Sequence, residues 1–237
     1  MINFNTFSIT ARCETTGQFG VAVSTKLPAV GHLCPYARAD IGAISTQSFV
    51  NPYIGINGLD YLEVGLDADE VMNRVLSEDP NPELRQVSIV DRNGKAAAFT
   101  GEKCDTWHGH ITGNNFAVAG NMLVGEQTIR NMGETFEQTD DLSLAKRLLK
   151  CLESGQLAGG DKRGKQSAAL LVVDKEKYPL VDLRVDENKD PVRELHRIYT
   201  VSKKELYPFV DMLPTLKNPG GTFDLKNARE MGVIQDD

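Results

Sequence analysis

The sequence lacks the features that would assign the protein to a membrane, a secretory route or a nucleic acid. No stretch of its 237 residues approaches the length of apolar chain that a bilayer-spanning helix requires. The N-terminus has no basic region followed by an apolar core, so we do not interpret it as a signal peptide. Because 33 acidic residues stand against 26 basic ones, we expect neither nucleic acid nor a membrane as a partner.

Cysteine patterns typical of metal sites and disulfide frameworks are also missing. The four cysteines include no C-x-x-C pair: Cys13, Cys34, Cys104 and Cys151. A disulfide framework is not expected in a chain of this length without an export signal. We therefore expect reduced thiols and a cytoplasmic location.

Two further patterns are too incomplete to indicate a cofactor or a metal. Gly17, Gly20 and Gly31 do not form a phosphate-binding fingerprint, so nucleotide binding has no support. His108 and His110 have the spacing of metal ligands, but no carboxylate or cysteine pattern completes the set. We interpret "WHGH" as a loop with solvent-facing histidines and expect neither a metal nor another cofactor.

What the sequence does contain is ordinary for a soluble globular protein with a sizeable core, namely 41% hydrophobic and 25% charged residues. Period-two alternation, Val-rich runs and an "NG" turn predict strands in residues 6–12, 19–25, 41–49, 85–101 (a hairpin), 114–123, 167–174 and 181–187. Helical spacing predicts helices in residues 58–65, 67–79, 126–138, 140–155 and 190–199. The second helix has Asp67 and Glu70 spaced as a capping box.

The order of these segments indicates the architecture. Strand blocks separated by helix pairs favour two stacked sheets with helices over both outer faces. A parallel doubly wound fold would instead alternate single strands with single helices. Since no repeat or flexible linker interrupts the pattern, we expect one domain over residues 1–237, with a weakly patterned tail from about Leu213.

The first predicted hairpin sets the surroundings of Thr6. If its turn centres on residues 15–17, opposed residues have numbers that sum to about 32, and Thr6 then lies across from Lys26 with Cβ atoms about 5 Å apart. Ser8 and Ser24 would share that polar face, which suggests the floor of a site. A one-residue slip would place the two partners on opposite faces.

A lysine in that place has a chemical use if Thr6 becomes the first residue of the chain. The α-amine of a terminal threonine is a base beside its own hydroxyl. A neighbouring ammonium lowers the pKa of that amine and leaves more of it neutral near pH 7. The alternative is an exposed strand end with a solvated lysine.

Several segments together resemble a bacterial family, domain of unknown function 1028: "TFSITAR", "GQFGVAVSTKLPAVG", "STQSFVNPYIGINGLDYL", "IVDRNGKAAAFTG", "AGGDKRGKQSAALLVV" and "VDLRVDENKDPVRELHRI". The resemblance implies an N-terminal-nucleophile (Ntn) hydrolase-like fold. We therefore expect the α+β class and a four-layer αββα sandwich of two antiparallel sheets. In that family the "TFS" threonine commonly follows the initiator methionine. Here five residues precede Thr6, so exposing it requires cleavage of the Asn5–Thr6 bond.

The resemblance also implies supporting residues. Gln47 and Asn51 in "TQSFVNP" could orient a substrate or donate to an oxyanion, or else cap a turn. Asn121 in "AGNM" ends a strand where Ntn enzymes often place an oxyanion donor; the alternative is a turn. Their place in the sequence leaves both readings open.

The segment "AGGDKRGKQSAAL" carries the remaining candidates. Arg163 could clamp a carboxylate in a bidentate manner, Asp161 could hold an amine or the arginine itself, and Gln166 lies just ahead of a buried strand. The alternative is a helix-to-strand loop with an internal ion pair.

The expected function is an Ntn-type amidohydrolase that cleaves a small amide or related C–N bond. Thr6 would be the nucleophile, Lys26 would tune its amine, and Asn121 or Gln47 would stabilise the oxyanion. Two alternatives stay open: a non-catalytic module that binds a small metabolite or serves as a scaffold, and catalysis by the loop at residues 159–167. A small-molecule substrate and a homo-oligomer, by default a homodimer, are the expected partners.

Overall fold

The computed structural model of the protein describes residues 6–105 and 107–230. The chain divides into two compact units, Met1–Leu195 and His196–Asp237. All ten strands named below belong to the first unit. The expectation of one domain over the whole chain stays a prediction, since the unit that carries the strands ends at Leu195.

The first unit contains two antiparallel sheets. In the larger sheet the strand order is β10-β9-β2-β1-β8-β7. Its strands are β1 (Thr6–Arg12), β2 (Phe19–Thr25), β7 (Gly109–Gly113), β8 (Phe116–Asn121), β9 (Ser167–Val173) and β10 (Val181–Val185). The smaller sheet has the order β3-β4-β5-β6 and consists of β3 (Pro35–Arg38), β4 (Gly42–Ser48), β5 (Arg85–Asp91) and β6 (Ala96–Thr100).

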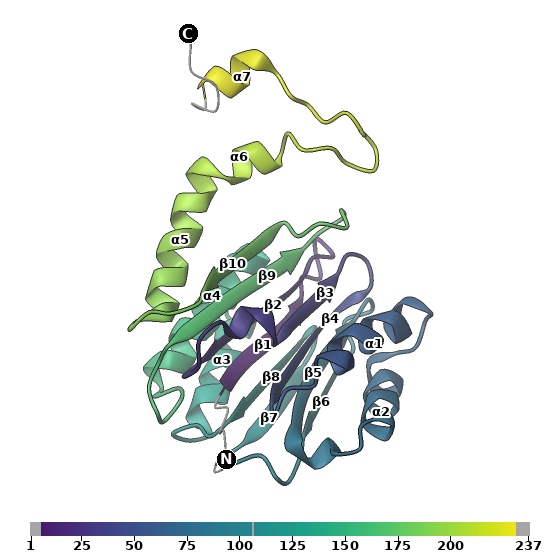
Figure 1. The fold of residues 1–237 in the computed structure, drawn as a ribbon, viewed down its shortest axis with the longest axis vertical. Helices are drawn as coiled ribbons and strands as arrows, with labels where there is room; N and C mark the ends of the chain where they lie inside the picture. The colour runs from purple at the N-terminus through teal and green to yellow at the C-terminus, as the bar shows by residue number, and fades with distance from the viewer. Residues whose placement is uncertain (1–5, 106, 231–237) are drawn as a thin grey trace. The chain divides into compact units, whose positions relative to one another are not determined.

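Two helix pairs cover the outer faces of this sandwich. Helices α1 (Pro52–Glu63) and α2 (Ala68–Glu78) pack on the smaller sheet, and α3 (Gln127–Glu137) and α4 (Leu144–Leu157) pack on the larger one (Figure 1). Short 3-10 helices occupy Val30–His32 and Pro82–Leu84. The expected α+β class and the four-layer αββα sandwich of antiparallel sheets are confirmed.

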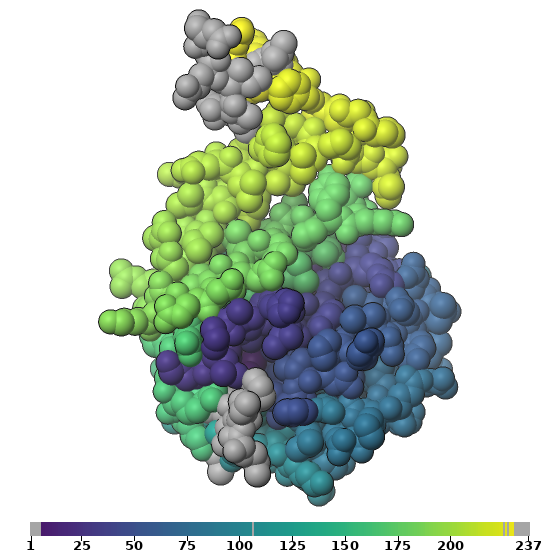
Figure 2. Space-filling model, viewed as in Figure 1, coloured from purple at the N-terminus to yellow at the C-terminus, as the bar shows by residue number. Residues whose placement is uncertain are grey.

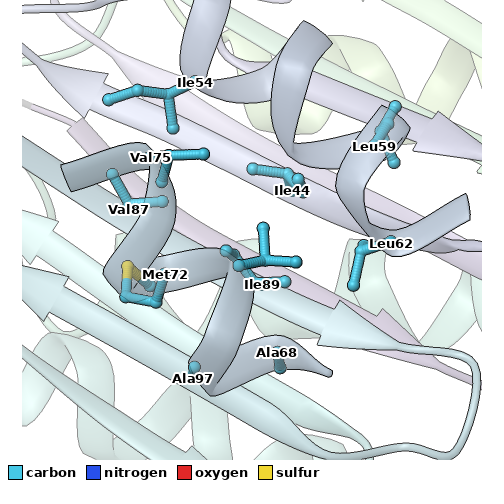
Figure 3. Packing of buried hydrophobic residues seen from close by; sticks show 11 residues of the cluster. Ile44, Ile54, Leu59, Leu62, Ala68, Met72, Val75, Val87, Ile89 and Ala97 are labelled. Carbon is cyan, nitrogen blue, oxygen red and sulfur yellow. The ribbon is translucent and has the colours of Figure 1, made fainter. Parts of the chain in front are cut away.

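The outer face of the smaller sheet is an apolar core. Strand residues such as Ile44, Val87 and Ile89 pack against α1 and α2, and Figure 3 shows the side chains of both helices pointing toward them. Asp67 caps α2, and the predicted capping box with Glu70 is formed. Burial of this cluster ties the helix pair to the sheet.

The opposite faces of the two sheets, which meet in the middle, are polar on one side and apolar on the other, where Phe19, Val21 and Ala43 pack together. Successive strand residues point to opposite sides, so β1 turns Phe7 and Ile9 toward the helices and Ser8 toward the other sheet. We call the buried polar set between the sheets the polar inter-sheet layer: Thr6, Ser8, Thr10, Ser45, Gln47, Gln86, Ser88 and Asn121.

Direct hydrogen bonds join the two sheets through this layer. Ser45 donates to Ser8 across 3.2 Å, and the hydroxyls of Thr10 and Ser88 lie 2.8 Å apart. On the face shown in the space-filling view, the purple N-terminal segments lie against the blue segments that follow them in the chain (Figure 2). The alternating polar residues of β1 therefore face a second sheet. The sequence pattern had instead predicted a half-buried strand whose polar face forms the floor of a site.

The second unit contains the end of α5 (Pro191–Glu205), α6 (Tyr207–Val210) and α7 (Leu225–Glu230). The rings of Tyr199 and Tyr207 are 6.0 Å apart between centroids. Large apolar side chains are exposed along this unit: Leu206, Phe209, Leu216 and Phe223. Within the part of the chain that the structure describes, no helix is both long and apolar enough to cross a membrane.

Candidate functional site

Thr6 begins the central strand of the larger sheet and is flanked on both sides by polar residues. Thr25 on β2 and Asn121 on β8 are its directly opposed partners. The Thr6 hydroxyl donates to the Thr25 hydroxyl across 3.2 Å. All three side chains are almost completely buried, with 3%, 2% and 0% of their surface exposed.

The predicted pairing of Thr6 with Lys26 is wrong by one residue. The connection between β1 and β2 runs from Cys13 to Gln18 and has six residues, so opposed numbers sum to 31. The connection is one residue shorter than a sum of 32 requires. The N–H of Gly17 donates to the carbonyl of Cys13 within it, with Gly17 at φ 77° in the left-handed region that suits glycine. Ser8 consequently opposes Val23, and Ser24 lies on the other face with Phe7.

Lys26 instead lies just beyond the last pair, at the same end of the sheet as Thr6. Its backbone N–H donates to Asp161 Oδ2 across 2.9 Å. Its side chain lies near the loop that precedes β9, since a Cβ placed on Gly164 of that loop would lie 4.0 Å from Lys26 Cδ. The direct lysine–threonine opposition on which an electrostatic role for Lys26 rested is absent from the β1–β2 ladder.

A chain of three buried amides connects Thr6 to the smaller sheet. Gln47 Nε2 and Asn121 Nδ2 each donate to Gln86 Oε1 across 2.8 Å. Gln47 Nε2 also lies 3.5 Å from the Thr6 carbonyl oxygen. Gln86, on β5, is fully buried at the centre of this chain. It was not among the residues selected from the sequence.

Backbone strain occurs directly beside two of these amides. Ser48 follows Gln47 with φ 67°, and Met122 follows Asn121 with φ 50°. A residue other than glycine in this region costs about 1–3 kcal/mol, and such residues cluster at functional sites. The two strained positions therefore mark the strand ends at Gln47 and Asn121 as a candidate site.

The glycine-rich loop ahead of β9 closes this end of the larger sheet. Asp161 pairs with Leu123 in an isolated bridge, and it is 3% exposed. Its carboxylate accepts hydrogen bonds from the backbone N–H and the guanidinium of Arg163 at 2.8 and 3.1 Å. Arg163 and Asp161 thus form the internal ion pair, and Arg163 keeps 28% of its side chain exposed.

In this structure Gln166 makes hydrogen bonds through its backbone, and Asn51 caps a helix and binds a carboxylate. The N–H of Gln166 donates to the Thr25 carbonyl across 3.0 Å, and its own carbonyl accepts from Asn188. Asn51 caps α1 by accepting from the N–H of Tyr53, and its Nδ2 donates to Asp79 Oδ2 across 2.7 Å.

The carboxylate that Asn51 contacts belongs to a buried ion pair. Asp79 binds Arg85 through two hydrogen bonds of 2.8 and 3.1 Å. Burial alone would raise the pKa of Asp79, but the hydrogen bonds from Arg85, Asn51 and the backbone of Asn81 outweigh it and lower the pKa to about 2.

The two thiols with the largest pKa shifts do not add reactive groups to the site. Burial raises the pKa of Cys34 and of Cys151 to about 12, so both thiols stay protonated near neutral pH. The segment interpreted as a histidine loop is partly strand, because His110 lies on β7 with its Nδ1 2.8 Å from the Thr100 hydroxyl. Among the described residues, no group of three or more His, Cys, Asp and Glu side chains could hold a metal ion.

A hollow of about 290 Å³ lies beside the same loop and is separate from the amide chain. It is lined by residues of α4, the loop and the start of α5: Glu153, Gln156, Leu157, Lys165, Asp190, Val192 and Arg193. Lys165 and Asp190 form an ion pair of 2.8 Å in its wall. Charged groups of both signs thus surround this hollow.

The structure brings Thr6, Asn121 and Gln47 together through Gln86, and it places Lys26 and Asp161 at the same end of the sheet. Asn51 serves a helix cap instead. The sequence signal for Gln86 was its alternation with Val87 on β5, in register with Gln47 of β4. That alternation is identical to the pattern of a half-exposed strand, so it did not single out a buried amide.

Comparisons with known proteins agree on one family. Residues 6–195 match the model of a family described as a family of unknown function (DUF1028). The crystal structure of SPO2555 from Silicibacter pomeroyi, described with the same family model, is similar to this chain with 30% identity and a TM-score of 0.86. The match covers 93% of this chain and 100% of SPO2555.

A more remote likeness involves Anbu (ancestral beta-subunit) from Yersinia bercovieri, with 11% identity and a TM-score of 0.38. It covers 89% of this chain and 99% of that one. No curated protein matches the chain. Since the family model spans both sheets and both helix pairs of the sandwich, the chain belongs to DUF1028.

Proposed function

We propose that the protein is an Ntn-type amidohydrolase that cleaves a small amide or related C–N bond, with Thr6 as its nucleophile. The observation that carries this proposal is the position of Thr6, the first residue of the central strand, between Thr25 and Asn121. A threonine in this place needs only a free α-amine to have a base beside its hydroxyl.

The amine would be freed by the chain itself. The Thr6 hydroxyl attacks the Asn5 carbonyl carbon, the C–N bond breaks, and the proton of the hydroxyl ends on the nitrogen. This step leaves an ester between Asn5 and Thr6 and a free amine on Thr6. Water then hydrolyses the ester, restores the hydroxyl and releases residues 1–5 with a carboxylate at Asn5.

In turnover the same hydroxyl would attack the carbonyl of a small amide. The α-amine takes the hydroxyl proton and returns it to the leaving nitrogen, and water hydrolyses the resulting ester. Gln47 is the side chain best supported as an oxyanion donor, because its Nε2 already lies 3.5 Å from a carbonyl oxygen of Thr6. Arg163, which is partly exposed, would hold an acidic group of the substrate.

The test combines a mass measurement with turnover. Freshly purified protein should have the mass of residues 6–237, and Thr6→Ala should keep all 237 residues. Amide hydrolysis should fall by on the order of a thousandfold or more in Thr6→Ala, whereas Thr6→Ser should still cleave. Full turnover by protein that keeps residues 1–5 would exclude this mechanism.

Two outcomes would select the alternatives. The internal Asp161–Arg163 ion pair and the burial of Thr6 favour a non-catalytic binding or scaffold module as the second candidate. Protein that keeps its first five residues and binds a small carboxylate without turnover would support that module. Activity that survives Thr6→Ala would point to the loop at residues 159–167.

A further inference from the structure

Asn121 Oδ1 is a buried acceptor that has no hydrogen-bond partner among the described residues. The other end of the same amide is satisfied, because its Nδ2 donates to Gln86 Oε1. Buried polar atoms in folded proteins are almost always paired, and an unpaired one often marks a functional position. Asn121 is completely buried, so bulk water does not supply the missing donor.

The orientation of this amide follows from fixed backbone groups. Gln86 Nε2 lies 3.0 Å from the carbonyl oxygen of Gly109 and 2.9 Å from that of Gly120. Carbonyl oxygens only accept hydrogen bonds, so the nitrogen of Gln86 must face them and its Oε1 must face Asn121. Asn121 then has to present Nδ2 to Gln86, which leaves its Oδ1 without a donor.

The geometry at Thr6 offers the donor that this oxygen lacks. Thr6 and Asn121 are directly opposed on neighbouring strands, where Cβ atoms are about 4.5–5.5 Å apart. An uncleaved Thr6 has a single amide N–H, whereas a protonated terminal amine has three donors and a positive charge. Breaking the Asn5–Thr6 bond would therefore create a strong donor next to an unpaired acceptor.

We propose that Asn121 Oδ1 accepts a hydrogen bond from the α-amine of Thr6 after cleavage, and that Gln86 is the positioning residue that keeps this oxygen available. The inference rests on the proposed function only in requiring a free Thr6 amine. It assigns a role to the oxygen of Asn121 that is separate from the expected role as an oxyanion donor, which would use the second N–H of Nδ2 beside the one given to Gln86.

The role has a measurable consequence for the amine. A hydrogen bond from the charged amine to Asn121 stabilises the protonated form, so removing the acceptor lowers the pKa of the amine. A role in oxyanion binding would leave the pKa of the free protein unchanged. The charged groups at this end of the sheet, Lys26, Asp161 and Arg163, are the same in every variant below.

The experiment uses the full chain with residues 1–5 replaced by a protease recognition sequence that is cut directly before Thr6. The protein is labelled with 15N-threonine, and the α-amine is titrated by NMR without substrate. Asn121→Ala should lower the pKa of the amine by about one pH unit, the size expected for a charged hydrogen bond. Gln86→Leu should lower it by a similar amount, because the freed Asn121 amide can rotate.

Thr10→Val is the matched control. It removes another hydrogen bond between the sheets, from the same strand and the same layer, and leaves the amide chain intact. The pKa of the amine should not change in this variant. A neutron structure of the wild-type full chain tests the orientation directly and requires no substitution: deuterons should lie on the Asn121 atom that faces Gln86.

An unchanged pKa in Asn121→Ala, or an oxygen of Asn121 facing Gln86, would overturn the proposal. A shift in Asn121→Ala without one in Gln86→Leu would overturn the positioning role of Gln86. These results are independent of turnover. Loss of the pKa shift in an active enzyme removes this inference alone, and a clear shift in a protein that hydrolyses nothing removes the proposed function alone.

Discussion

At the scale of single residues, the buried ion pair between Asp79 and Arg85 should contribute more to the free energy of unfolding than a surface pair does. Its side chains are 0% and 7% exposed. Asp79→Asn removes the negative charge and leaves Arg85 buried without it, so unfolding should become about 3–5 kcal/mol easier. Asp60→Asn, which breaks a surface pair with Arg38, should change stability by less than about 1 kcal/mol. Urea unfolding of the two variants would check this.

The same pair predicts a specific acid sensitivity. The pKa of Asp79 is lowered to about 2 in the folded state and is near 4 in an unfolded chain. Its contribution of about 2 kcal/mol is therefore fully present above pH 4 and is lost as the pH falls through 2. The stability difference between wild type and Asp79→Asn should shrink over this window. A difference that stays constant from pH 4 to pH 2 would contradict the lowered pKa.

The site residues show which chemistry a sequence reveals. Thr6 could be selected because it stands at the head of a clear strand pattern, and Asn121 because the family resemblance implies an oxyanion donor near a strand end. Gln86 could not, because burial of an amide depends on a second sheet that lies far away in the sequence. The partner of Thr6 was missed for a local reason, since the connection has one residue fewer than the predicted register requires, and Thr25 therefore takes the place of Lys26.

At the scale of secondary-structure elements, glycine in α1 reflects packing more than helix propensity. A Cβ on Gly55 would lie 2.2 Å from the Tyr36 ring on β3. Gly55→Ala should therefore destabilise the protein by about 1–3 kcal/mol through overpacking, although alanine favours helices by about 1 kcal/mol. Gly125→Ala has open space and should change stability by less than about 0.5 kcal/mol. Thermal unfolding that ranks the two variants in the reverse order would refute this account.

Elements with strong local signals were predicted well, and elements held by distant partners were not. The capping box of α2 and the hairpin of β5 and β6 follow from short-range chemistry. The start of α1 was placed too late because Gly55 and Gly58 weaken its helical pattern. Strands β3 and β7 were missed because short edge strands gain their order from the neighbour that pairs with them.

At the scale of the whole molecule, the rate at which the buried thiols react shows how often the folded protein opens. All four cysteines are buried: Cys13, Cys34, Cys104 and Cys151. We expect a thiol reagent such as Ellman's reagent to modify native protein only as fast as the fold opens, and to modify four thiols per chain in denaturant. Rapid modification of native protein at neutral pH would show that the sandwich exposes its interior more often than this packing implies.

The layered architecture was predictable because it depends on the order of segments. Strand blocks and helix pairs alternate along the chain, and that order alone favours two sheets between two helix layers. The polar part of the interface between the sheets was not predictable in the same way. In the sequence, Ser8 and Thr10 on β1 have the spacing of residues on a solvent-facing side of a strand. In the structure they are instead hydrogen-bonded to the hydroxyls of Ser45 and Ser88 on the other sheet.

The six-residue connection from Cys13 to Gln18 has a consequence for divergence within the family. Which side chain borders the threonine depends on the number of residues in this hairpin loop. A single insertion or deletion there would exchange Thr25 for an adjacent residue unless a bulge absorbs it. Relatives with loops of a different length should therefore differ in chemistry at this position even where the threonine itself is retained.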